Sequence, residues 1–144
     1  METKEAEMLR RYIGRQVQDS PSPFMNWLQP VILKVEEGSL AFQYTVRPEM
    51  TNPFGTLHGG VTAAIIDDAM GATLITYGED VFHVTVNLSV DYFAAARAGD
   101  VIIAETSVQK RGRQIVNIHC DVWNEDKTKL LAKGYSNLIK TPIK

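Results

Sequence analysis

The sequence has little cysteine, no long apolar run and no excess of one charge. Cys120 is the only cysteine among 144 residues, which excludes an internal disulfide and any multi-cysteine zinc or iron–sulfur site and favours a reducing compartment. No apolar run approaches the roughly 20 residues of a membrane span, and the polar, acidic start is unlike a signal peptide. These absences predict a cytoplasmic protein that is not bound to a membrane.

The balance of charge argues against nucleic acid as a partner. The chain has 15 Lys and Arg residues against 17 Asp and Glu residues, so its formal net charge of -2 creates no overall positive field. With 44% apolar and 22% charged residues, the composition is that of a folded globular protein. The length fits one domain. We expect a single domain over residues 1–144, with an N-terminal helical extension over residues 1–28.

Hydrophobic periodicity predicts the order of elements. The first 18 residues favour a helix, which the prolines at 21 and 23 end because each biases the preceding residue away from helical geometry. Residues 31–35 and 40–46 are typical of a hairpin, since apolar and other residues alternate in its second strand. Four further strands are expected over residues 84–93, 101–110, 114–123 and 130–139.

The alternation in residues 84–93 predicts which side chains share a face. We expect the odd positions, beginning with Thr85 and Asn87, to face one way and the apolar even positions the other. Short connections between the four strands predict an antiparallel meander. The predicted fold class is therefore α+β, with a twisted antiparallel sheet wrapped around one long central helix and an extra N-terminal helix.

The predicted central helix, residues 59–77, is the most informative segment. It is apolar nearly all round, which predicts burial on most sides, and its only charges are Asp67 and Asp68. A carboxylate in such a helix needs a partner or a purpose, and this argument selects Asp67. Asp68 points about 100° away around the helix axis and is expected to be solvated or to be a capping partner.

Two glycines open the helix, where free N–H groups and the helix dipole favour a developing negative oxygen. Gly59 and Gly60 therefore fit an oxyanion site, although a tight loop-to-helix turn would need the same residues. The run from Asn52 to Gly60, followed after six residues by Asp67, resembles the hotdog-fold thioesterases of the PaaI-type branch, in the 4-hydroxybenzoyl-CoA thioesterase superfamily. The resemblance covers the element order from about Val31 to Ile139.

This resemblance implies an acyl-CoA hydrolase with named site residues. It assigns the Gly59 N–H to the substrate carbonyl, and Asp67 to a role as general base or as nucleophile, which the sequence does not decide. It also implies that Asn52 orients the carbonyl or its loop and that Thr85 holds the attacking water. Three alternatives stay open: Asp67 as a structural residue at a subunit contact, Asn52 as a turn residue, and Thr85 as an ordinary strand residue.

His58 and the basic turn near residue 112 complete the candidate residues. His58 either orients the loop or contacts the thioester, and a buried structural histidine is an equal alternative. Lys110, Arg111 and Arg113 surround a turn and could meet the phosphates of coenzyme A, although a solvated hairpin tip would look the same. Gly60 and Asn87 are further candidate substrate-binding residues. The histidines show no metal-ligand spacing, and the expected reaction needs no cofactor or metal.

The spacing within the helix predicts a homodimer. Asp67 lies eight residues after Gly59, which corresponds to about 12 Å along a helix. If both residues act on one thioester, they must come from different subunits, in a homodimer or a dimer of dimers. The expected function is hydrolysis of an acyl-CoA to free acid and CoA. The alternatives are a non-catalytic acyl-CoA-binding module that uses the same groove and a purely structural assembly domain, and the preferred acyl group is not determined.

Overall fold

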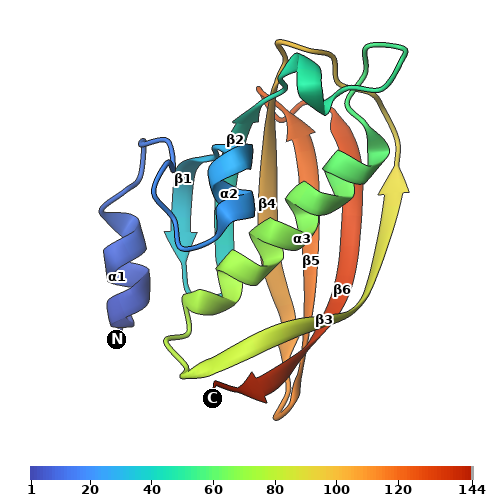
Figure 1. The fold of residues 1–144 in the computed structure, drawn as a ribbon. Coiled ribbons are helices and arrows are strands. Elements are labelled where there is room, and N and C mark those ends of the chain that lie inside the picture. The colour runs from blue at the N-terminus through green and yellow to red at the C-terminus, as the bar shows by residue number, and fades with distance from the viewer. Residues whose placement is uncertain (144) are drawn as a thin grey trace.

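The computed structural model describes residues 1–143, and in it a long helix lies across one face of a six-stranded antiparallel sheet (Figure 1). The elements follow the predicted order: α1 (Lys4–Arg10), α2 (Pro23–Leu28), β1 (Val31–Glu36), β2 (Ser39–Thr45), η1 (Pro48–Met50), α3 (Gly59–Ile75), β3 (Val81–Tyr92), β4 (Val101–Arg111), β5 (Ile115–Asn124) and β6 (Leu130–Pro142). The α+β prediction is confirmed. Lys144, the last residue of the predicted domain, lies outside the described part.

Strand β3 is not part of the meander that the short connections predicted. The strand order is β1-β2-β4-β5-β6-β3, so only β4, β5 and β6 pair in sequence order, and β3 pairs with β6 at the far edge. The reason is competition for edges. Strand β4 already pairs with β2 on one side and with β5 on the other, which leaves β3 the free edge of β6.

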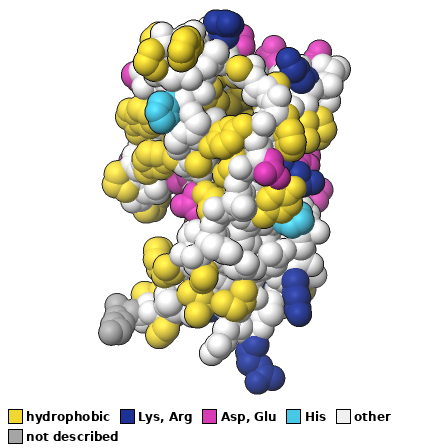
Figure 2. Space-filling view, turned by 90° about the vertical axis from the view of Figure 1, so that its right-hand side faces the viewer, with side chains coloured by type: hydrophobic (Ala, Val, Ile, Leu, Met, Phe, Trp, Pro, Cys, Tyr) yellow, Lys and Arg dark blue, Asp and Glu magenta, His cyan; other side chains and the backbone are white. Residues whose placement is uncertain are grey.

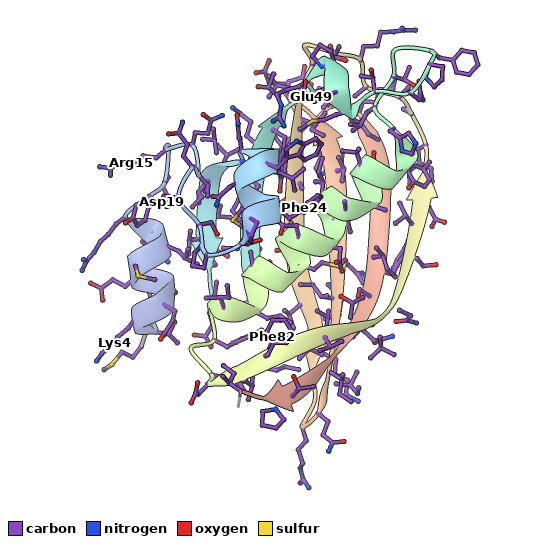
Figure 3. The ribbon with its side chains drawn as sticks, viewed as in Figure 1. Lys4, Arg15, Asp19, Phe24, Glu49 and Phe82 are labelled. Atoms are coloured by element: carbon purple, nitrogen blue, oxygen red, sulfur yellow. The ribbon has the colours of Figure 1, made fainter. Side chains whose placement is uncertain are left out.

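The predicted alternation within β3 is wrong, because the strand contains a bulge. Its register with β6 shifts between Thr85 and Asn87, so Val86 is the extra residue. Before the bulge the odd positions face α3, and after it the even positions do. As a result Thr85 faces the helix while Asn87 faces the outer side of the sheet. The exposed Phe82 lies on the first part of the strand (Figure 3).

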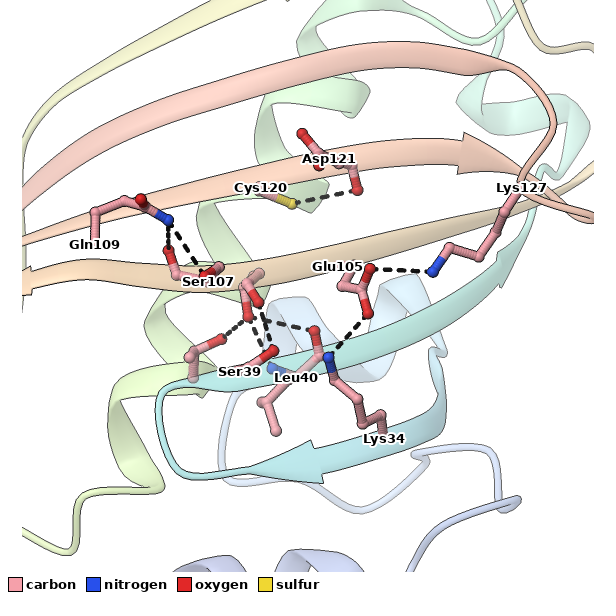
Figure 4. A network of polar contacts seen from close by, with 11 residues as sticks. Lys34, Ser39, Leu40, Glu105, Ser107, Gln109, Cys120, Asp121 and Lys127 are labelled. Carbon is pink, nitrogen blue, oxygen red and sulfur yellow. Dashed lines mark hydrogen bonds and ion pairs between the residues drawn. The ribbon is translucent and has the colours of Figure 1, made fainter.

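Helix α3 packs closely on the sheet at Gly134 of β6, where a Cβ would lie 2.5 Å from Ile66 Cγ2. A buried polar network holds the C-terminal half of the helix to β2 and β4 (Figure 4). In this network Thr106 Oγ1 lies 2.5 Å from Thr73 Oγ1 of α3 and accepts the Leu40 N–H at 2.9 Å. These contacts set the height and rotation of α3 above the sheet, and with them the direction of its functional side chains.

The N-terminal segment covers the β1 edge of the sheet. Helix α1 is shorter than the predicted 18 residues, and Gly14 adopts a positive φ of 85°, from which the chain runs along β1. The Gly14 N–H donates to Ile32 O, and the Val17 N–H donates to Pro30 O, both at 2.7 Å. Residues 23–28 form the short helix α2 where a turn was expected. No helix in residues 1–143 is long and apolar enough to cross a membrane.

Candidate active site

The first turn of α3 leaves one backbone donor free. His58 caps the helix: its Nδ1 accepts the Gly60 N–H at 2.9 Å, and its carbonyl accepts the N–H groups of Val61 and Thr62, both at 3.0 Å. Within residues 1–143 the Gly59 N–H has no acceptor. The Gly59 N–H is therefore available to a ligand, and its assignment to a substrate carbonyl stays a prediction, whereas the Gly60 N–H is used within the loop.

Tyr92 at the end of β3 contacts the same turn. Its hydroxyl donates to the Gly59 carbonyl at 2.5 Å. The ring lies beside the glycine, since a Cβ at Gly59 would lie 3.5 Å from the Tyr92 oxygen. The sequence analysis did not select Tyr92, because β3 and the start of α3 are far apart in the chain and no motif links them.

Asn52 shapes the loop that leads into α3. Its Oδ1 accepts the N–H groups of Phe54 at 3.0 Å and Thr56 at 3.2 Å, and its Nδ2 donates to Thr56 Oγ1 at 2.7 Å. These are the contacts of a turn residue. The side-chain amide keeps a second N–H, so the assignment of Asn52 to the substrate carbonyl stays a prediction.

The second candidate group lies halfway along α3. Asp67 is half-buried, and its Oδ1 accepts a hydrogen bond of 2.7 Å from Thr85 Oγ1. The β3 bulge makes this contact possible, because it turns Thr85 toward the helix. Because the Thr85 hydroxyl donates its hydrogen to Asp67, its oxygen can still accept a bond from water. Asp67 Oδ2 takes no hydrogen bond from residues 1–143. The pair is therefore suited to bind one water molecule.

Asp68 is not the solvated residue that its helix position suggested. Its Oδ2 is buried without a partner in residues 1–143, and so is the hydroxyl of Tyr44, which is 1% exposed on β2. Burial, followed by the nearby charge of Asp67, raises the pKa of Asp68 to about 6. Burial, followed by the charge of Asp68, raises the pKa of Tyr44. The two neighbouring carboxylates thus lie on different sides of α3, Asp67 toward β3 and Asp68 toward β2.

Arg111, a predicted substrate-binding residue, is engaged within the protomer. Its guanidinium pairs with Glu79 and lies 3.8 Å from the centre of the Tyr77 ring. Lys140 also binds Glu79, at 3.0 Å. The hydrogen bonds from Arg111 and Lys140 lower the pKa of Glu79. This cluster lies beyond the C-terminus of α3, and in it the charge of Arg111 is already paired with that of Glu79.

Arg113 lines a groove on the outer face of the sheet. The groove has a volume of about 520 Å³ and is lined by Lys110, Gly112, Arg113, Gln114, Ile115, Asn117 and Asn137. An asparagine ladder runs from it toward the sheet edge: Asn117 Nδ2 donates to Asn137 Oδ1 at 2.9 Å, and Asn137 Nδ2 donates to Asn87 Oδ1 at 3.1 Å. Asn87 is thus linked to the groove and lies just past the bulge that carries Thr85.

The two candidate groups do not meet within one protomer. Gly59 and Asp67 lie on one straight helix, so about 12 Å separates them along its axis. Residues 1–143 contain no group of three or more His, Cys, Asp or Glu side chains that could hold a metal ion. Each protomer therefore presents two candidate half-sites, one with a free backbone N–H and one with a carboxylate.

The burial of Asp68 predicts a pH-dependent stability. Because the pKa of Asp68 is raised above its unfolded value near 3.9, folding is penalised once the pH is high enough for the unfolded chain to ionise this carboxyl. This penalty is absent below about pH 4 and develops as the pH rises through about 6. Asp68→Asn should therefore raise the free energy of unfolding by about 1 kcal/mol at pH 8, a figure reduced for partial exposure. Urea unfolding of the wild type and of Asp68→Asn at pH 4 and at pH 8 measures this difference.

The matched control is Asp19→Asn, which removes the same charge from an exposed position of the N-terminal segment, outside the strands, and should leave the stability unchanged. An equal gain from Asp68→Asn at pH 4 and pH 8, or no gain at either, would contradict the buried charge.

Comparison with known proteins identifies the family of this chain. Residues 54–131 match the family model of the thioesterase superfamily. Human acyl-coenzyme A thioesterase 13 is 29% identical over 103 residues, which span 72% of this chain and 74% of that protein. A phenylacetic acid degradation-related protein from Ralstonia eutropha superposes with a TM-score of 0.79 at 26% identity, covering 95% of this chain and 99% of that one.

The PaaI protein of Escherichia coli, from the phenylacetic acid degradation operon, has the same fold, with a TM-score of 0.79 at 19% identity over 96% of this chain and 91% of that one. The predicted resemblance to hotdog-fold thioesterases of the PaaI type is confirmed. Since the family model matches more than half of its residues, among them the helix that carries Gly59 and Asp67, this chain belongs to the thioesterase superfamily.

Proposed function

We propose that this chain hydrolyses acyl-CoA thioesters to free acid and CoA, at a site shared between two copies of the chain. The observation that carries the proposal is the pair of half-sites: a Gly59 N–H with no acceptor and an Asp67 carboxylate held by Thr85. The similarity to human acyl-coenzyme A thioesterase 13 supports the substrate class.

These groups suffice for the chemistry of thioester hydrolysis. A water molecule bound to Thr85 Oγ1 and Asp67 Oδ2 attacks the thioester carbonyl while Asp67 accepts its proton. The Gly59 N–H of the partner stabilises the negative charge that develops on the carbonyl oxygen. When the C–S bond breaks, CoA leaves as a thiolate, which needs no strong acid because a thiol has a pKa near 8.5. The proton held by Asp67 then returns to the thiolate sulfur.

The free edge of β3 supports a dimer. The β1 edge is covered by the Gly14–Val17 segment, whereas the outer edge of the 12-residue strand β3 pairs with nothing in residues 1–143. Phe82 and Val86 on this strand are 63% and 58% exposed. Hydrophobic side chains spread over the β3 side of the molecule (Figure 2). A long, apolar, unpaired edge is a site for pairing with another chain, and here we propose the partner's β3.

The facing pattern of β3 limits the registers that are open to this pairing. Opposite residues of antiparallel strands point to the same face, so a symmetric pair must be centred on a residue. We propose the pair that is centred on Ser89, in which Asp91 would lie opposite the partner's Asn87 on the outer face. Tyr92 would then lie opposite the bulge that carries the partner's Thr85. This register would bring the carbonyl-binding half-site of one protomer to the carboxylate half-site of the other.

The outer groove fits the nucleotide end of CoA. Lys110 and Arg113 are exposed cations on its rim, and phosphate groups bind well to such pairs. The asparagine ladder connects the groove with Asn87, close in the strand to Thr85. We therefore assign the phosphates to Lys110 and Arg113 and not to Arg111, whose charge is paired with Glu79.

Two wider expectations stay predictions. The free and buried thiol of Cys120 is compatible with a cytoplasmic location. Residues 1–28 are proposed as an extension of a single hotdog domain, since α1 and the segment after it lie along the β1 edge, away from both half-sites.

Replacing the carboxylate tests the reaction. Asp67→Asn should lower turnover about 100- to 10,000-fold, because the amide cannot accept the proton of the attacking water. Free-thiol release from short-chain, long-chain and aromatic acyl-CoAs measures this loss and ranks the substrates. Asp68→Asn, the same change one residue later, should leave turnover close to wild type. Equal losses in both variants would overturn the proposal. Tight binding of acyl-CoA by the wild type without release of thiol would also overturn it, and this is the outcome expected for a non-catalytic binding module.

Mixing inactive subunits tests the shared site. Gly59→Val blocks the carbonyl end and Asp67→Asn removes the carboxylate, so each homodimer should be inactive. In a random equimolar mixture, half of the dimers are mixed and each has one intact site, so about a quarter of the wild-type activity should return. The activity of the Asp67→Asn homodimer alone provides the baseline. No recovery, despite subunit exchange observed by native mass spectrometry, would contradict the cross-subunit arrangement.

Removing the groove cations tests the CoA assignment. The double variant Lys110→Gln and Arg113→Gln should raise KM for an acyl-CoA about 10-fold with little change in kcat, because the lost contacts are to the non-reacting end. The matching acyl-pantetheine, which lacks the nucleotide, should show no such change. Lys129→Gln, an exposed cation at the β5–β6 turn, is the control. An equal rise in KM for acyl-pantetheine would place the CoA phosphates elsewhere.

A further inference from the structure

The backbone around Gly59 is held at every polar group except one. The two peptide units that flank Gly59 offer four such groups. The His58 carbonyl accepts two N–H groups of the first turn, and the Gly60 N–H donates to the His58 ring. The Gly59 carbonyl accepts the Tyr92 hydroxyl. Among the contacts of residues 1–143, only the Gly59 N–H is left for a ligand.

Burial does not account for the Tyr92 contact. Within one protomer Tyr92 is 53% exposed, so its hydroxyl could bond to water there at no desolvation cost. It instead donates to a backbone carbonyl at 2.5 Å, from the end of β3 to the start of α3. The contact therefore acts mainly on the backbone that it reaches. That backbone belongs to a glycine, which has more conformational freedom than any other residue.

We propose that Tyr92 is a positioning residue for thioester hydrolysis: by holding the Gly59 carbonyl, it orients the glycine so that the neighbouring Gly59 N–H points at the substrate carbonyl. The His58 ring holds the N–H end of the same peptide unit, and Tyr92 holds its carbonyl end. A donor oriented before the reaction stabilises the developing charge without a cost of reorganisation. This inference rests on the proposed function and adds a residue to its carbonyl-binding half-site.

A positioning role has a kinetic signature that a structural role lacks. The Gly59 N–H interacts most strongly when charge develops on the carbonyl oxygen, so a misoriented donor lowers kcat more than it changes KM. The melting temperature and the dimeric state should stay the same, because phenylalanine retains the ring and removes only the hydroxyl that reaches the Gly59 carbonyl.

The first experiment compares Tyr92→Phe with Tyr12→Phe. Tyr12 is a matched control, since it is 51% exposed and its hydroxyl makes no hydrogen bond within residues 1–143. Tyr92→Phe should lower kcat about 10-fold, a loss comparable to one hydrogen bond, with KM changed less than about twofold. Tyr12→Phe should match the wild type. An unchanged kcat in a Tyr92→Phe variant that hydrolyses acyl-CoA, or a loss explained by a lowered melting temperature or a lost dimer, would overturn the inference.

The second experiment reads the substrate carbonyl directly. An acyl-CoA labelled with ¹³C at the thioester carbonyl is bound to the Asp67→Asn variant, which retains the substrate, and its C=O stretch is measured by infrared difference spectroscopy. Donation from Gly59 lowers this frequency. Adding Tyr92→Phe should reverse part of the shift, whereas adding Tyr12→Phe should not.

The two hypotheses fail separately. Without any hydrolysis by the wild type the proposed function is wrong, yet the infrared shift still tests the action of Tyr92 on bound acyl-CoA. An identical carbonyl frequency with and without the Tyr92 hydroxyl would contradict the positioning role.

Discussion

An α-helix begins with N–H groups that it cannot satisfy itself, and the candidate site depends on how this chain distributes them. The first turn of α3 donates three of these groups to His58 and leaves the Gly59 N–H free. The cap thus removes competing donors and concentrates the positive end of the helix at one point. Tyr92 and the Asn52 loop then support that turn from outside the helix. In the proposed site, the Gly59 N–H is therefore the one backbone donor of this turn that is offered to the substrate carbonyl.

The same helix carries two adjacent carboxylates with different surroundings. Asp67 gains a hydroxyl donor from β3, whereas Asp68 faces a buried phenol that it does not reach within hydrogen-bond distance. The pKa of Asp68 is raised accordingly, chiefly by burial. Two residues of one type, about 100° apart on a helix, can thus perform different tasks because the sheet supplies a partner on one side only.

Strand β3 joins the parts of the site. It is an edge strand that carries Thr85 at a bulge, Asn87 just beyond the bulge and Tyr92 at its end. Each of these residues contacts a different part of the proposed site: the carboxylate, the asparagine ladder and the carbonyl-binding turn. The strand also offers the unpaired edge through which a second copy would complete the site. A change in its register would therefore affect all of these parts together.

Features that depend on neighbours along the chain could be predicted from the amino-acid sequence. The hairpin, the helix that opens at Gly59, the strands and the family resemblance follow from local patterns, and the separation of Gly59 from Asp67 follows from the rise of a helix. Other features became known only from the fold. They are the pairing of β3 with β6, the orientation of Thr85 toward Asp67, the burial of Asp68, the ion pair of Arg111 with Glu79 and the contact of Tyr92 with Gly59. Each of these depends on competition for edges, on a bulge or on contacts between distant segments, which local periodicity does not encode.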